Sequence, residues 1–80
     1  MLKNLFFRND IVHVSATVED PAIAELLDAI ISDKFIERHR SYNVQTKVTT
    51  FTITMRQRNY SGMVRELKLN GLRLEKGKLV

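Results

Sequence analysis

The sequence predicts an α+β fold, and two patterns carry that prediction. Apolar and polar residues alternate over residues 11–18 and again over residues 50–55, within an expected strand of residues 44–57, which is typical of half-buried strands. Between them, residues 20–33 place apolar side chains at helical spacing behind an Asp-Pro pair that favours a helix start. Eighty residues, 44% hydrophobic and 28% charged, are typical of one globular domain, which we place over residues 1–80.

The first strand is expected over residues 11–18, IVHVSATV. Its valines and its alanine fall on one side, whereas His13, Ser15 and Thr17 fall on the other. One face should therefore pack on a core while the other meets solvent. Ahead of this strand, the turn-forming residues 8–10 are expected to fold residues 3–7 back as a short edge strand.

A helix is expected to begin at Pro21. The side chain of Asp20 can accept a hydrogen bond from a free backbone N–H of the first turn, and proline suits the first helical position because its missing N–H has no partner there. The apolar stripe allows two ends for this helix. It stops near residues 32–33 and leaves residues 34–40 as a strand, or it continues to Arg40. We favour the shorter helix, because that segment and the β-rich run after it have the pattern of a hairpin.

The two strands of this hairpin are expected to be joined by a loop at residues 41–43, and the second strand to run over residues 44–57. The apolar residues of its second half alternate with threonines, but Val44 and Val48 have the opposite parity. A bulge near residues 49–50 would bring the two halves into phase. Without a bulge, one end of the strand would project beyond the core.

The last third of the chain is compatible with two arrangements. We favour a second helix over residues 59–71, where Gly71 suits a left-handed C-terminal cap, followed by a final strand over residues 72–80 that bends at residues 76–77. The competing arrangement is a tight hairpin at residues 70–71.

The elements in order are strand, helix, strand, strand, helix, strand. This βαββαβ order predicts a ferredoxin-like fold, a small antiparallel sheet with two helices on one face. The other face of such a sheet stays open unless a partner covers it.

The side chains expected on the open face carry hydroxyl groups or positive charge. If the apolar side of the long strand faces the helices, its threonines and the arginines after it face outward. Guanidinium groups and hydroxyls hydrogen-bond phosphates well, although threonine is equally typical of a solvated strand. No aromatic side chain is expected there for stacking on RNA bases. The residues predicted to bind a partner are, from this face, His13, Thr52, Thr54, Arg56, Arg58 and Arg73, together with Arg38 and Arg40 of the preceding segment.

No catalytic site is predicted, and we expect neither an enzyme nor a cofactor or metal site. The two histidines, His13 and His39, have no carboxylates at ligand spacing, and the chain has no glycine-rich phosphate loop. No segment is apolar over the length of a membrane span. The absence of cysteine favours a reducing compartment, so we expect a cytoplasmic protein.

Charge is distributed unevenly along the chain. Residues 1–33 contain two basic and six acidic side chains, whereas residues 34–80 contain eleven basic and three acidic ones. Small size and segregated charge predict a binding protein that blocks or modulates another protein, like the compact inhibitors common among mobile genetic elements.

One alternative is a nucleic-acid-binding protein that contacts phosphates through the basic Thr/Arg face with little sequence specificity. A homodimer is also compatible with the sequence. Its seam would be an apolar cluster that otherwise completes the core, namely Leu2, Leu5, Phe6 and Phe7.

Overall fold

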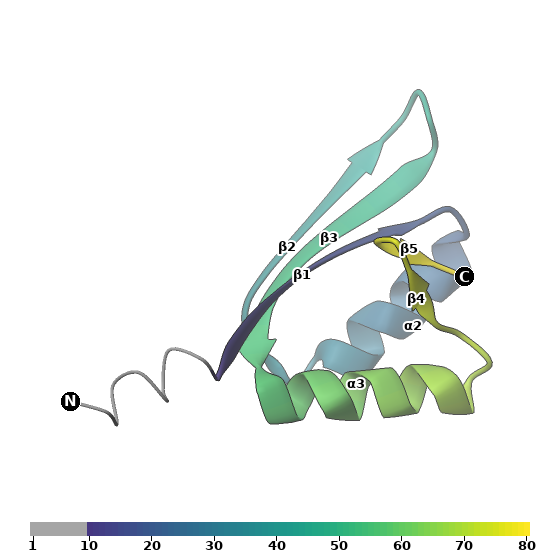
Figure 1. The fold of residues 1–80 in the computed structure, drawn as a ribbon. Helices are drawn as coiled ribbons and strands as arrows, with labels where there is room; N and C mark the ends of the chain where they lie inside the picture. Colours follow the sequence, from purple (N-terminus) through teal and green to yellow (C-terminus); the bar gives the residue numbers. More distant parts are fainter. Residues whose placement is uncertain (1–9) are drawn as a thin grey trace.

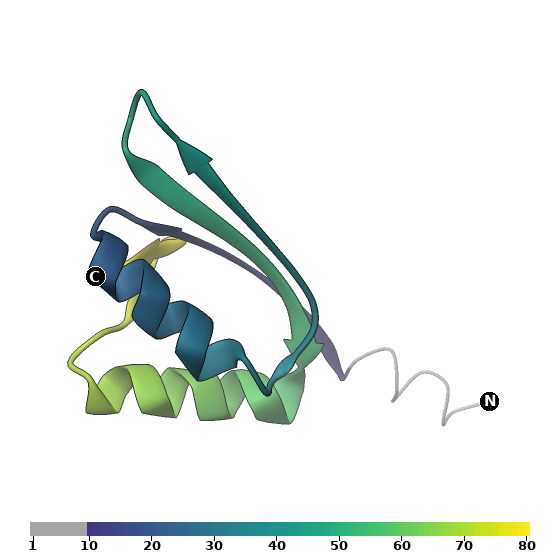
Figure 2. The same ribbon diagram turned by 180° about the vertical axis from the view of Figure 1, so that it is seen from behind.

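One five-stranded sheet and two helices make up the fold. The computed structural model describes residues 10–80 of the chain. Both helices lie on the same face of the sheet (Figures 1 and 2). The expectations for an edge strand at residues 3–7 and for an apolar cluster at residues 2–7 lie outside the described residues. The elements in chain order are β1 (Ile11–Val18), α2 (Pro21–Ile31), β2 (Phe35–Asn43), β3 (Val48–Arg56), α3 (Gln57–Leu69), β4 (Leu74–Glu75) and β5 (Lys78–Leu79).

The sheet is mixed, with strand order β2-β3-β1-β5-β4. Strand β3 pairs antiparallel with both β1 and β2, whereas β5 runs parallel to β1. The ferredoxin-like order with its all-antiparallel sheet is therefore wrong, although the α+β class is confirmed. The predicted single last strand is a hairpin of β4 and β5. It reverses at Lys76 and Gly77, whose φ angles of 52° and 77° are those that a two-residue hairpin turn requires.

The first strand and the first helix form as predicted. The carboxylate of Asp20 accepts the Ala22 N–H at 2.8 Å and so caps α2. The helix ends at Ile31, so the longer alternative to Arg40 is wrong. The ammonium group of Lys34 donates to the Ile30 carbonyl at 2.9 Å, which satisfies one of the free carbonyls at the helix end.

The β2–β3 turn differs from the prediction. Residues 41–43 belong to β2, and the turn comprises residues 44–47. The Asn43 side chain accepts the N–H groups of Gln45 and Thr46 at 2.9 and 3.1 Å, and Lys47 adopts a φ of 59°. An asparagine side chain thus replaces the glycine that usually marks such a turn.

Because Val44 lies in the turn, no bulge is needed at residues 49–50, and β3 keeps one phase from Val48 to Arg56. The irregularity occurs instead in β2, between Phe35 and Glu37. The tip of the hairpin extends past both helices, as Figure 2 shows.

Helix α3 begins earlier in the chain than predicted, but its C-terminal cap is at the predicted residue. Its first residue is Gln57, whose N–H donates to the Asp10 carbonyl at 2.7 Å, so the expected extension of β3 to residue 57 is wrong. At the other end, Gly71 has a φ of 73°, and the Leu72 N–H donates to the Leu67 carbonyl at 2.8 Å. This is the left-handed cap that was predicted, and the alternative hairpin at residues 70–71 is wrong.

The core lies between the sheet and the two helices. The helix-facing side chains of β3, Phe51, Ile53 and Met55, have no exposed surface. Helix α2 contributes Leu27 and Ile31, whereas the buried residues of α3 are Met63 and Leu67. Burying a side chain of this size stabilises the fold by roughly 1.5–3 kcal/mol. No helix within residues 10–80 has the length and hydrophobicity needed to cross a membrane.

Candidate protein-binding surface

Strands β1 and β3 build the centre of the open face. His13 lies opposite Thr54, Ser15 opposite Thr52 and Thr17 opposite Thr50. A hydrogen bond of 3.1 Å joins Nδ1 of His13 to Oγ1 of Thr54. Three of the residues predicted to bind a partner, His13, Thr52 and Thr54, therefore lie together on this face.

Strand β2 extends this face to the sheet edge. Glu37 lies opposite Thr54, His39 opposite Thr52 and Ser41 opposite Thr50, so both histidines of the chain are on the same side of the sheet. At about 4.8 Å between neighbouring strands, β1 and β2 are roughly 10 Å apart across β3. No cluster of three or more ligating side chains within residues 10–80 could hold a metal ion.

The arginines of β2, Arg38 and Arg40, do not lie on the open face with the predicted residues of β1 and β3. They lie opposite Ile53 and Phe51, residues that point into the core, and so project toward the helices. The Asp28 carboxylate of α2 accepts hydrogen bonds from both guanidinium groups. Neighbouring residues of a strand point to opposite faces of the sheet, so the alternation along β2 directs Arg38 and Arg40 toward the helices.

Arg40 is the more firmly held of the two. Its second guanidinium nitrogen donates to Glu25 at 2.8 Å, and the group lies 5.4 Å above the ring of Phe51. The hydrogen bond with Glu25, assisted by Asp28, raises the pKa of Arg40 above its ordinary value. This cluster joins β2 to α2 and leaves little free charge for a partner.

The remaining predicted arginines are dispersed. Arg56 ends β3 on the open face, where it forms an ion pair of 3.0 Å with Asp10. Arg58 lies in α3, not on the sheet, which corrects its predicted position. Arg73 precedes β4 and pairs with Glu75 at 3.2 Å. The eight predicted residues therefore do not form one surface.

The exposed edge of β2 was not predicted from the sequence. This nine-residue strand has no neighbour on its outer side among the described strands, and all nine residues are exposed. Large apolar side chains are exposed at six positions of residues 10–80, four of them in β2 or its turn. These four are Phe35, Ile36, Tyr42 and Val44, with exposed fractions of 41%, 55%, 55% and 75%. An available signal was the lack of apolar alternation in FIERHRSYN, which is typical of an edge strand.

A groove of about 440 Å³ adjoins this edge on the helix side. It lies beside the ion pairs that join α2 to β2, and both Ala29 of the helix and Phe35 of the strand line it. Its lining residues are Glu25, Asp28, Ala29, Ser32, Phe35 and Arg38. A strand added beside β2 would direct alternate side chains toward this groove and toward the open face.

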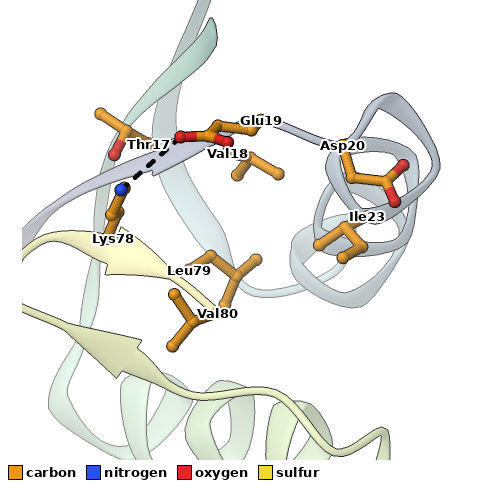
Figure 3. Close-up of a pocket in the computed structure, with 8 residues that line it drawn as sticks. All are labelled: Thr17, Val18, Glu19, Asp20, Ile23, Lys78, Leu79 and Val80. Atoms are coloured by element: carbon orange, nitrogen blue, oxygen red, sulfur yellow. Dashed lines mark ion pairs between the residues drawn. The ribbon is translucent and has the colours of Figure 1, made fainter.

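A smaller cleft of about 200 Å³ lies beside the start of α2 (Figure 3). Its polar groups already have partners. Asp20 caps the helix, Glu19 pairs with Lys78 at 3.6 Å, and the Thr17 hydroxyl donates to the Gly77 carbonyl at 3.3 Å. These contacts stabilise the fold, and the cleft offers no paired nucleophile and base.

Comparisons of the chain with protein-family models, with curated proteins and with solved structures find no match. The candidate surface therefore rests on its own geometry.

Proposed function

We propose that this chain is a non-catalytic binding protein that attaches to another protein through the exposed edge of β2 and thereby blocks or modulates it. The observation that carries the proposal is the edge itself, a nine-residue strand exposed at every position and accompanied by four exposed large apolar side chains. The proposal includes a cytoplasmic site of action, as expected from the cysteine-free sequence.

The edge offers both affinity and selectivity. In an antiparallel pairing, alternate residues exchange two backbone hydrogen bonds, so roughly four or five residues of β2 have groups available for a partner strand. Each such bond contributes about 0.5–1.5 kcal/mol. Selectivity would come from the groove beside Phe35 and from His39 and Ser41 on the open face.

Binding of nucleic acid by the sheet face is less well supported. Arg38 and Arg40 point to the helices, Arg56 is paired with Asp10, and Arg58 is on α3. The phosphates of a nucleic acid would therefore meet few free cations on this face.

A photo-crosslinking amino acid in place of His39 tests the proposal in the native cell. We expect one discrete protein adduct there. The same amino acid at Glu75, on the opposite edge strand β4, is the control and should give none. No adduct at position 39, or equal adducts at both positions, would contradict the proposal.

The captured partner then allows a sharper measurement. Tyr42→Gln should weaken binding about tenfold or more, whereas Leu69→Gln, which alters an even more exposed apolar residue on α3, should change it less than about twofold. In hydrogen exchange, alternate amides of β2 should become protected on binding. Uniform protection elsewhere with β2 unchanged would exclude strand addition.

A further inference from the structure

The cations of the described chain fall into two groups. Six of them, on or near the sheet, lie within 4.0 Å of a carboxylate; these are Lys34, Arg38, Arg40, Arg56, Arg73 and Lys78. The other five have no such partner within residues 10–80. Two of them, Lys47 and Lys76, occupy hairpin turns. The remaining three are on α3.

These three cations, Arg58, Arg65 and Lys68, share one side of the helix. At 100° per residue, Arg58 and Arg65 point almost in the same direction, opposite the buried Met63 and Leu67. A separation of seven residues places them about 10 Å apart along the helix axis, with Lys68 about 5 Å further on. All three are exposed.

No acidic side chain of α3 offsets this charge. Glu66 is the only acidic residue of the helix, and its carboxylate accepts a hydrogen bond from Lys34 at 2.7 Å. Two neutral hydrogen-bonding side chains, Gln57 and Ser61, are exposed on the same side. The face therefore presents closely spaced positive charge with additional polar groups.

We propose that this face of α3 binds the phosphate backbone of duplex DNA without reading its sequence. The charge is complementary to a regular row of anions, and a helix about 10–12 Å across matches the major groove, about 12 Å wide. A cleft of about 120 Å³ that Lys68 helps to line adjoins this face, and Leu69 is the only exposed large apolar residue of α3. The charged surface itself therefore lacks the exposed apolar centre that protein interfaces use.

This surface is separate from the β2 edge, so each proposal can fail without the other. Both helices cover one face of the sheet (Figure 1), and the helical spacing directs the cations of α3 away from the core. A protein partner on β2 and DNA on α3 would then be held by one small domain.

Fluorescence anisotropy with a labelled 20-base-pair duplex of arbitrary sequence tests the inference. Three phosphate contacts give a slope of about −2.7 in log K against log salt, so affinity should fall about 40-fold between 50 and 200 mM salt. A second duplex of unrelated sequence should bind within about twofold. An absence of binding at 50 mM salt would overturn the proposal.

A matched pair of variants locates the binding. The Arg58→Gln, Arg65→Gln, Lys68→Gln triple variant should lose at least tenfold in affinity at 50 mM salt. The control, Lys47→Gln, Arg73→Gln, Lys76→Gln, has the same net charge and should stay within about threefold of the parent. Equal losses in both variants would assign the binding to net charge alone and overturn the site.

Two further measurements test the contribution of a single α3 cation and the preference of the face for DNA over other anions. Arg65→Gln by itself should lower the salt slope by about 0.9 with the fold retained, since the side chain is exposed. Polyglutamate or anionic phospholipid vesicles that bind as tightly as the duplex, with the same dependence on α3, would show a general anion surface and refute the assignment to DNA.

Discussion

Replacing Ile53 by alanine tests the division of β3 into a buried and an open side. Ile53 has no exposed surface and lies opposite Val14 at the centre of the sheet. Truncating a fully buried isoleucine costs roughly 2–5 kcal/mol, and we expect about 3 kcal/mol here. At about 0.05–0.15 kcal/mol per residue, the whole domain has a stability of roughly 4–12 kcal/mol, so the loss is a large share of it. Its neighbour Thr52 is exposed, and Thr52→Ala should cost less than about 0.5 kcal/mol.

Thermal unfolding followed by far-UV circular dichroism measures both variants. For a domain of this size, 1 kcal/mol corresponds to about 4–8 °C, so Ile53→Ala should lower Tm by about 12 °C or more and Thr52→Ala by less than about 4 °C. Similar losses in the two variants would show that both sides of β3 are buried. That result would refute the assignment of an open face and with it the surface next to the β2 edge.

Two other substitutions test the junction between α2 and α3. Gly62→Ala should raise the free energy of unfolding, measured by urea titration, by about 0.5–1 kcal/mol, because alanine favours a helix. The added Cβ meets only the Lys34 side chain, at 3.5 Å. A lower free energy of unfolding in the variant would contradict this and would show that the site is crowded. Lys34→Gln should cost about 1 kcal/mol at neutral pH, because the ammonium group bonds Glu66 and the end of α2. The hydrogen bond with Glu66 raises the pKa of Lys34 above its ordinary 10.5, so this contribution is complete below about pH 10.5 and is lost as the pH rises through the folded-state value. The stability difference between parent and variant should therefore shrink at high pH, and a difference that stayed constant would contradict the linkage.

The acidic and basic side chains that are separated along the sequence lie next to each other in the folded protein. Five of the six acidic residues in the first 33 positions pair with cations that come from positions 34–80. The pairs are Asp10–Arg56, Glu19–Lys78, Glu25–Arg40, Asp28 with Arg38 and Arg40, and Asp33–Lys34. Each exposed pair contributes only about 0–1 kcal/mol. Their larger consequence is that the fold brings these opposite charges together, so that three of the five cations without a carboxylate partner within residues 10–80 lie on α3.

Local patterns were enough to predict the elements whose signals are local. The alternation of residues 11–18, the Asp20 cap and the left-handed cap at Gly71 all correspond to what the structure contains. The start of α3 could not be predicted in this way. Arg56 provides no side-chain cap, and the first turn is held by a contact from Gln57 to Asp10, 47 positions earlier.

The sequence by itself determined the α+β class, the side of β3 that is buried and the hydroxyl-rich character of the opposite side, because these follow from periodicity along one strand. Only the tertiary structure decided that β2 is an edge strand, that Arg38 and Arg40 face α2, and that the chain ends in a hairpin beside β1. The physical reason is register. The Asn43 turn and the irregularity after Phe35 set which residues of β2 oppose β3, and a shift of one position would exchange the two faces.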